Sequence, residues 1–191
     1  MRSAKLVVAL LAAAMACGMG LPAAAVGGTG VDHVVVAAKL ELSSSAIRAN
    51  KPIPAEYTCD GADQSPPLSW NKLPYGTQTV ALVVDDPDAP GGTWVHWVVY
   101  NLPTSIRELP PGIHAVSELP NGGRQGTNSF KRIGYGGPCP PQGTRHRYFF
   151  RLYALDTALD LAPGATKAQL MQAMEPHILG VGELIATYAR Q

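Results

Sequence analysis

The sequence is poor in charge and has few cysteines. Charged residues make up 15% of the 191-residue chain, and its 15 Lys and Arg residues never form a long run. Without a basic cluster, neither a nucleic-acid surface nor an anionic-membrane surface is indicated. The hydrophobic fraction of 46% is too high for a disordered chain, so one globular domain with a single core is expected.

Several enzyme motifs are missing as well. There is no H-E-x-x-H zinc motif and no G-x-S-x-G nucleophile elbow. Two histidines and one acid can form an open metal site, but the spacing of His96 and His146 does not indicate one, and we expect no metal and no cofactor. Cys139 as a thiol nucleophile with His146 as its base is the stronger enzymatic alternative.

The N-terminal segment has the composition of an export signal. Arg2 and Lys5 precede an apolar run over 6–16, and residues 21–25 (LPAAA) end in an A-x-A cleavage pattern. We expect a signal peptide over 1–25, a flexible segment over 26–39 and one domain over 40–191, in a periplasmic or secreted protein. Cleavage would leave 13 basic and 14 acidic residues, a charge of about −1.

Two other interpretations of this segment stay open. No charge interrupts residues 6–26, as in a membrane anchor, although Gly18, Gly20 and Pro22 weaken a spanning helix. Alternatively, Cys17 follows the residues Ala-Met-Ala, which form a weak lipoprotein cleavage site, so the protein could instead be lipid-anchored through Cys17.

Only two cysteines would remain after export, because Cys17 leaves with the signal. An even pair in an oxidising compartment favours a disulfide between Cys59 and Cys139. Two buried free thiols are the alternative, since the sequence does not give the separation that a bridge requires. A bridge would remove the Cys139 nucleophile.

Proline and glycine divide the chain into short segments that favour strands. With 17 Pro and 20 Gly, apolar runs over 78–84, 94–102 and 147–155 are separated by turns. The connection over 103–145 is so long that we expect it to be functional or clamped to the body. Two later segments, 167–174 and 183–190, have helical composition, and Thr166 is a candidate N-cap for the first.

Two of these strands begin with a histidine above an apolar face. Strict alternation groups the following residues: Trp94, His96, Val98 and Tyr100 in one strand, and His146, Tyr148, Phe150 and Leu152 in the other. Asp86 and Asp88 precede the first strand in a turn that Pro90 stiffens. A carboxylate near a histidine favours its protonated form. We therefore expect a small pocket in which Asp86 orients a histidine and both histidines donate hydrogen bonds to an anion.

Two segments resemble the signature regions of phosphatidylethanolamine-binding proteins. They are residues 86–97 (DPDAPGGTWVHW) and 136–148 (GGPCPPQGTRHRY). The chain is most similar to the bacterial Raf-kinase-inhibitor-like branch, which also has a segment of the type seen at 65–70 (SPPLSW). The resemblance spans roughly 40–190, and Cys139 departs from the eukaryotic pattern, in which glycine is usual.

This resemblance implies a mainly β fold, with a large antiparallel sheet packed on a smaller sheet and short C-terminal helices. It also implies a non-catalytic binding protein with a pocket for a small anionic ligand or phospholipid head group. The expected ligand-binding residues, counting Asp88 in the turn, are Asp86, Asp88, Pro90, Trp94, His96, Pro140, Pro141, His146 and Tyr148. The alternative is an interaction protein that inhibits a protease or kinase partner, and a homodimer stays open.

The export signal predicts the N-terminus of the mature protein. Because a small-residue site follows a short apolar core, intact-mass analysis of exported protein should find Val26 as the first residue. A lipid-modified N-terminus at Cys17, or an uncut chain in the membrane fraction, would contradict this prediction.

Overall fold

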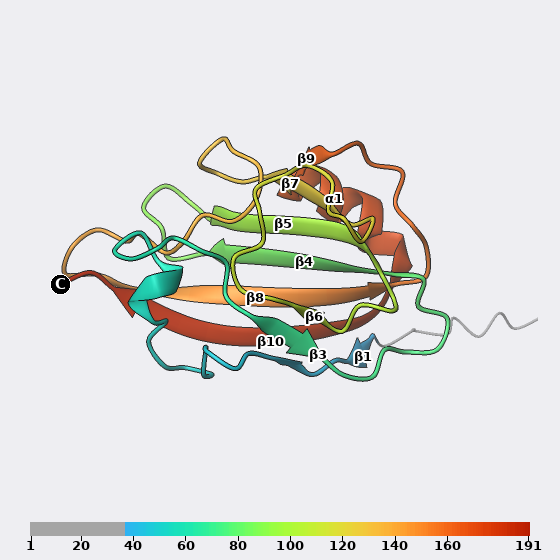
Figure 1. Ribbon diagram of the computed structural model, residues 1–191, viewed down its shortest axis with the longest axis horizontal. Helices are drawn as coiled ribbons and strands as arrows, with labels where there is room; N and C mark the ends of the chain where they lie inside the picture. The colour runs from blue at the N-terminus through green and yellow to red at the C-terminus, as the bar shows by residue number, and fades with distance from the viewer. Residues whose placement is uncertain (1–36) are drawn as a thin grey trace, which may run out of the picture. The chain divides into compact units, whose positions relative to one another are not determined.

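Two β-sheets form the body of the protein in the computed structural model, which describes residues 37–191 (Figure 1). The larger sheet has the strand order β1-β10-β8-β4-β5-β7-β9, and the smaller has the order β2-β3-β6. The expected mainly β fold is confirmed. The expected signal peptide over 1–25 and most of the segment over 26–39 lie outside the described residues. Within 37–191, no helix is long and apolar enough to cross a membrane.

The elements have the following bounds in chain order. The first half comprises β1 (Ala38–Lys39), β2 (Leu42–Ser43), the 3-10 helix η1 (Ala55–Tyr57), β3 (Leu68–Trp70), β4 (Thr79–Asp86) and β5 (Trp94–Pro103). The second half comprises β6 (Glu108–Leu109), β7 (Arg124–Thr127), β8 (Arg145–Leu155), β9 (Gly164–Thr166), α1 (Lys167–Met174), the 3-10 helix η2 (Glu175–His177) and β10 (Ile178–Ala189).

Strand β4 is the centre of the larger sheet. All eight of its residues are buried, as its continuous apolar run predicts for a strand covered on both faces. It pairs antiparallel with β5 on one side and with β8 on the other. Parallel pairing occurs only toward the edges, between β1 and β10 and between β7 and β9, so the sheet is mixed rather than wholly antiparallel.

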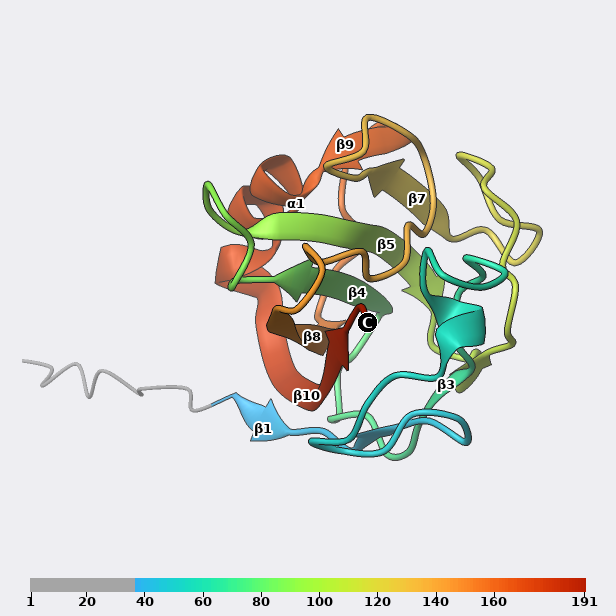
Figure 2. The same ribbon diagram turned by 90° about the vertical axis from the view of Figure 1, so that its left-hand side faces the viewer.

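The two faces of the larger sheet are covered by different elements. Figure 2 shows α1 on one side and the smaller sheet with β3 on the other. Leu170 and Met174 of α1 pack with Tyr153 on one face. On the opposite face, Phe150 shares a core with Leu68 of the smaller sheet. The sheet therefore has two apolar layers, one on each side.

One of the two expected C-terminal helices is correct and the other is wrong. Residues 167–174 form α1, and Thr166 and Gln169 make a reciprocal capping box at its start. Residues 183–190 instead belong mostly to β10, which pairs with β8 as far as Ala189. Leu184 and Ala186 are buried by this pairing, so ladder hydrogen bonds and core packing override the helical composition of the segment.

The long connection over 103–145 is clamped to the body, as expected. Cys139 forms a disulfide with Cys59, with a Cα–Cα distance of 5.4 Å. The Tyr135 hydroxyl donates to the Tyr57 carbonyl at 2.8 Å, and the Gly137 amide donates to Asp63 at 2.6 Å. These contacts fix the C-terminal part of the connection against the segment around η1.

The turn between β4 and β5 is held against β8 by Asp88. Its carboxylate accepts hydrogen bonds from the Arg147 backbone amide at 2.9 Å and from the guanidinium at 2.7 and 2.9 Å. The Asp88 amide also donates to Asp86 at 2.8 Å. Hydrogen bonds from Arg147 lower the pKa of Asp88 from 3.8 to about 2. Asp88 therefore fixes the turn in which Asp86 lies.

Loss of the disulfide should weaken the fold. The bridge spans 80 positions, so in the chain-entropy model the Cys59→Ser/Cys139→Ser variant should lose up to about 4 to 5 kcal/mol of unfolding free energy. Urea unfolding of variant and wild type measures the difference, and non-reducing peptide mapping should recover the linked peptides. Two alkylatable thiols in the native, unreduced protein would show that the bridge is absent.

The Asp88 clamp should weaken in acid. Because the pKa of Asp88 is lower in the folded state, its stabilising contribution is complete above about pH 4 and is lost as the pH falls toward 2. Asp88→Asn should therefore unfold at a slightly lower temperature than wild type at pH 7, since both partners reach solvent. Thermal scans from pH 7 to 2 should show the two proteins converging, and a constant difference would contradict the assignment.

Candidate functional site

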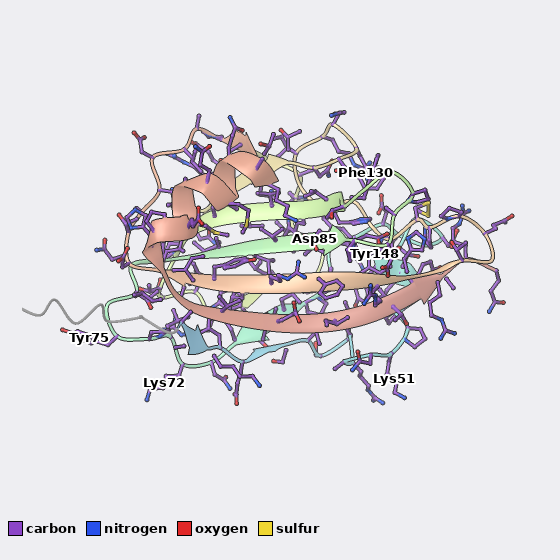
Figure 3. The ribbon with its side chains drawn as sticks, turned by 180° about the vertical axis from the view of Figure 1, so that it is seen from behind. Lys51, Lys72, Tyr75, Asp85, Phe130 and Tyr148 are labelled. Carbon is purple, nitrogen blue, oxygen red and sulfur yellow. A yellow bond between two sulfur atoms is a disulfide. The ribbon has the colours of Figure 1, made fainter. Side chains whose placement is uncertain are left out.

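A cavity of about 260 Å³ lies where β4 ends and β5 and β8 begin. Its lining residues are Ala89, Pro90, Trp94, His96, Phe130, Cys139, Pro140, Pro141 and His146. Six of these are residues that the sequence predicted for ligand binding. Figure 3 shows Tyr148 and Phe130 toward the same end of the sheet. The two signature segments thus meet at one cavity although about forty residues separate them.

His146 is held at the cavity by a buried carboxylate. Its Nδ1 lies 2.7 Å from Asp86 Oδ2, and both side chains are nearly inaccessible to solvent, with exposures of 7% and 5%. Its Nε2 lies 3.3 Å from the Thr144 hydroxyl oxygen, and that hydroxyl donates its hydrogen to the Pro141 carbonyl at 2.7 Å. Both ring nitrogens therefore face oxygen atoms that accept, with the short contact at Nδ1 and the long one at Nε2.

His96 reaches the cavity because β5 contains a bulge. Val84 pairs with Trp97 and Asp85 with Val95, which leaves His96 as an extra residue. The expectation that His96 shares a face with Val98 and Tyr100 is therefore wrong. Those two residues pack on the α1 side of the sheet, while the His96 ring lies 5.2 Å from the Tyr148 ring. The bulge therefore places His96 beside Tyr148, and the sequence had assigned both residues to one pocket.

His96 also has a different hydrogen-bonding role from the one expected. Its Nδ1 lies 2.6 Å from the Gly136 carbonyl oxygen, which can only accept, so Nδ1 carries the hydrogen. Burial lowers the pKa of His96, opposed by the Gly136 carbonyl and the Asp86 charge. The neutral ring then has a lone pair on Nε2, which is an acceptor. This arrangement contradicts the expectation that His96 donates to an anion, and the donor role of His146 stays a prediction.

Tyr148 supplies a buried hydroxyl near these histidines. Its oxygen is inaccessible to solvent and has no hydrogen-bond partner among residues 37–191. Burial raises the pKa of Tyr148, and the neighbouring Asp86 charge raises it further, so the phenol keeps its proton. Tyr148 is not a wall of the cavity itself, but its hydroxyl is a neutral group that still needs a partner.

Aromatic rings and prolines form the rim of the cavity. Trp94 and Phe130 meet edge to face at 5.4 Å and are 40% and 37% exposed. The Arg132 guanidinium lies 5.2 Å from the Phe130 ring centre. The sequence analysis missed Phe130, which is an isolated aromatic residue in a long loop. Neither alternation nor the resemblance pointed to it.

The three carboxylates before β5 have separate roles. Asp86 orients His146 at the cavity, whereas Asp88 lies outside the lining residues and holds the turn. Asp85 is buried and pairs with Arg151 at 2.8 Å and with Lys167 of α1. Asp88 therefore acts as a positioning residue and does not contact the cavity.

Two larger hollows offer weaker chemistry. One, of about 640 Å³, is lined by residues 38–41 and 71–75, and another, of about 580 Å³, lies beside the end of β10. Neither is lined by a buried ionisable side chain. The smaller cavity is the candidate site because it alone among these three combines buried histidines with an apolar rim.

Two catalytic or metal-based alternatives lack their key groups in the described part of the chain. The disulfide consumes the Cys139 thiol that a Cys139/His146 hydrolase would require. The Thr144 hydroxyl gives its proton to Pro141 rather than to His146, so it is not arranged as a nucleophile. No cluster of three metal-ligating side chains occurs within 37–191.

Comparisons with known proteins agree with this geometry. The family model described as phosphatidylethanolamine-binding protein matches residues 43–189. A UPF0098 protein from Methanothermobacter thermautotrophicus is 49% identical over 151 residues, covering 79% of this chain and 99% of the relative. A UPF0098 protein from Aquifex aeolicus is 45% identical, with coverages of 79% and 89%.

Solved structures give the same result. A phosphatidylethanolamine-binding protein homologue from Chlamydia trachomatis matches with a TM-score of 0.73 and 40% identity, covering 80% of this chain and 99% of that one. YbcL from E. coli, described as a new member of the mammalian family, matches with a TM-score of 0.75 and 31% identity, with coverages of 81% and 100%. The chain belongs to the phosphatidylethanolamine-binding protein family.

Proposed function

We propose that this chain is an exported, non-catalytic binding protein whose cavity takes small phosphate-like anions or phospholipid head groups. The observation that carries this proposal is the His146 ring, held between Asp86 and Thr144 at the cavity wall. The Nε2 of His146 makes only a long 3.3 Å contact with Thr144, so a hydrogen on this nitrogen can be donated to an anion's oxygen atom instead. The disulfide supports export, because such bonds persist in oxidising compartments.

The size of the cavity favours a head group over a whole lipid. Pockets for drug-sized ligands span about 300 to 1,000 Å³, and this one measures about 260 Å³. A phosphate group would lie near His146 at the polar end, and its organic substituent would extend along Trp94 and Pro140 at the rim. The exposed aromatic rings give that substituent apolar surface to contact.

The second candidate function is a protein-interaction module that inhibits a protease or kinase. The exposed Trp94 and Phe130 rings favour it, since aromatic residues are enriched at protein interfaces. The two functions separate experimentally. A variant that loses the His146 side chain at the cavity wall should bind an anionic ligand more weakly. The same variant should keep an interaction made through the outer surface, whether the partner is another protein or a second copy of the chain.

Loss of the His146 donor should weaken anion binding. A hydrogen bond to a charged group contributes roughly 1.5 to 3 kcal/mol, so His146→Ala, which has no side-chain donor, should bind O-phosphoethanolamine about tenfold or more weakly. Calorimetry at neutral pH measures the affinities. His177→Ala is the matched control, because His177 pairs with Asp156 away from the cavity. Equal affinities for wild type and both variants would rule out the anion pocket.

A further inference from the structure

We propose that His96 makes this cavity select oxyanions that carry a hydrogen-bond donor, such as protonated phosphate, over oxyanions that carry none, such as sulfate. The inference rests on the proposed function, because it concerns the ligand of the same cavity. In this inference His96 accepts a hydrogen bond from the ligand whereas His146 donates one, and His96 therefore determines specificity.

The orientation of the His96 ring is fixed by Gly136. The Gly136 amide donates to the His96 carbonyl at 2.9 Å, and the His96 Nδ1 donates back to the Gly136 carbonyl at 2.6 Å. A Cβ atom at Gly136 would lie 2.6 Å from the Phe130 ring, so only glycine allows this close approach. The reciprocal pair leaves the ring with one orientation and one neutral tautomer.

This tautomer leaves an acceptor without a donor. His96 is 2% exposed and lines the cavity, and its Nε2 has no hydrogen-bond partner among the described residues. A buried acceptor without a partner destabilises the site, and a ligand hydrogen can satisfy it. A bare anionic oxygen would meet the Nε2 lone pair and be repelled.

The donor and the acceptor in the cavity come from different strands. His146 on β8 offers a hydrogen at Nε2, while His96 on β5 offers a lone pair. A complementary ligand therefore has anionic oxygens on one side and a hydrogen on the other. Inorganic phosphate keeps at least one P–OH at neutral pH, whereas sulfate has no hydrogen; a phosphate monoester, with a second pKa of about 6, keeps a P–OH only in its monoanionic form.

Acid should weaken the preference for phosphate over sulfate. Burial lowers the pKa of His96, and the charged or titratable groups near it are Asp85 and Asp86 of β4, Tyr148 and His146 of β8, and Arg132 beside Phe130. Above its pKa His96 accepts, and below it Nε2 gains a hydrogen and donates. Sulfate binding should therefore strengthen as the pH falls below the ordinary histidine value of 6.5.

The test compares inorganic phosphate with sulfate by calorimetry at pH 7.5 and constant ionic strength. Wild type should bind phosphate at least tenfold more tightly than sulfate. His96→Gln should bring this ratio close to one, because an amide can present either a donor or an acceptor. His177→Gln should keep the wild-type ratio. Equal wild-type affinities would overturn the inference and leave the anion pocket intact, whereas no binding of either ion would overturn both.

Two further measurements use the wild-type protein alone, so the test does not depend on the folding of a variant. The ratio of phosphate to sulfate affinity should fall as the pH is lowered from 7.5 into the range below 6.5 where His96 gains its second hydrogen, and a ratio that stays constant down to the pH of acid unfolding would contradict the inference. Glycerophosphoethanolamine, whose ammonium carries hydrogens, should bind more tightly than glycerophosphocholine if the donor comes from a head group. If phosphate is preferred over sulfate but glycerophosphoethanolamine is not preferred over glycerophosphocholine, free phosphate is identified as the source of the donor.

Discussion

Two successive buried carboxylates at the end of β4 determine much of the surrounding structure. Asp85 and Asp86 point to opposite sides of the sheet, and each needs a partner because a buried charge is costly without one. Asp85 takes Arg151 and Lys167, which ties the start of α1 to the sheet. Asp86 takes His146, which aligns the start of β8 with the cavity. One pair of residues thus links the helical layer to the binding site.

Much of the fold could be predicted from the sequence because its strongest signals are local. The apolar run of β4 and the Thr166 cap of α1 indicate their structures within a few residues. Residues 183–190 could not be assigned this way, since their strand conformation depends on pairing with β8, about thirty residues earlier. The composition of a segment reports its local preference, whereas the hydrogen bonds of a strand depend on another strand that can lie far away in the sequence.

The residues that line the candidate site could largely be predicted from the sequence, but whether each one donates or accepts a hydrogen bond could not. The signature segments contain eight of the nine lining residues, six of which were named as ligand-binding residues, and the paired cysteines were also identified. The role of His96 depends on a bulge and on a carbonyl forty residues away, neither of which alternation can reveal. Phe130 was missed for the same reason, because only the folded loop places its ring beside Trp94.

The strand order of the larger sheet also constrains how the protein folds during synthesis. β10 lies between β1 and β8, so the sheet cannot be completed until residues 178–189 have left the ribosome. Until then, one edge of β8 has no strand to pair with, and the contacts that close the sheet join distant parts of the chain. Such topology slows folding and exposes an aggregation-prone edge. The sheet therefore stays incomplete until β10 has been synthesised, and the open edge of β8 is exposed during that interval.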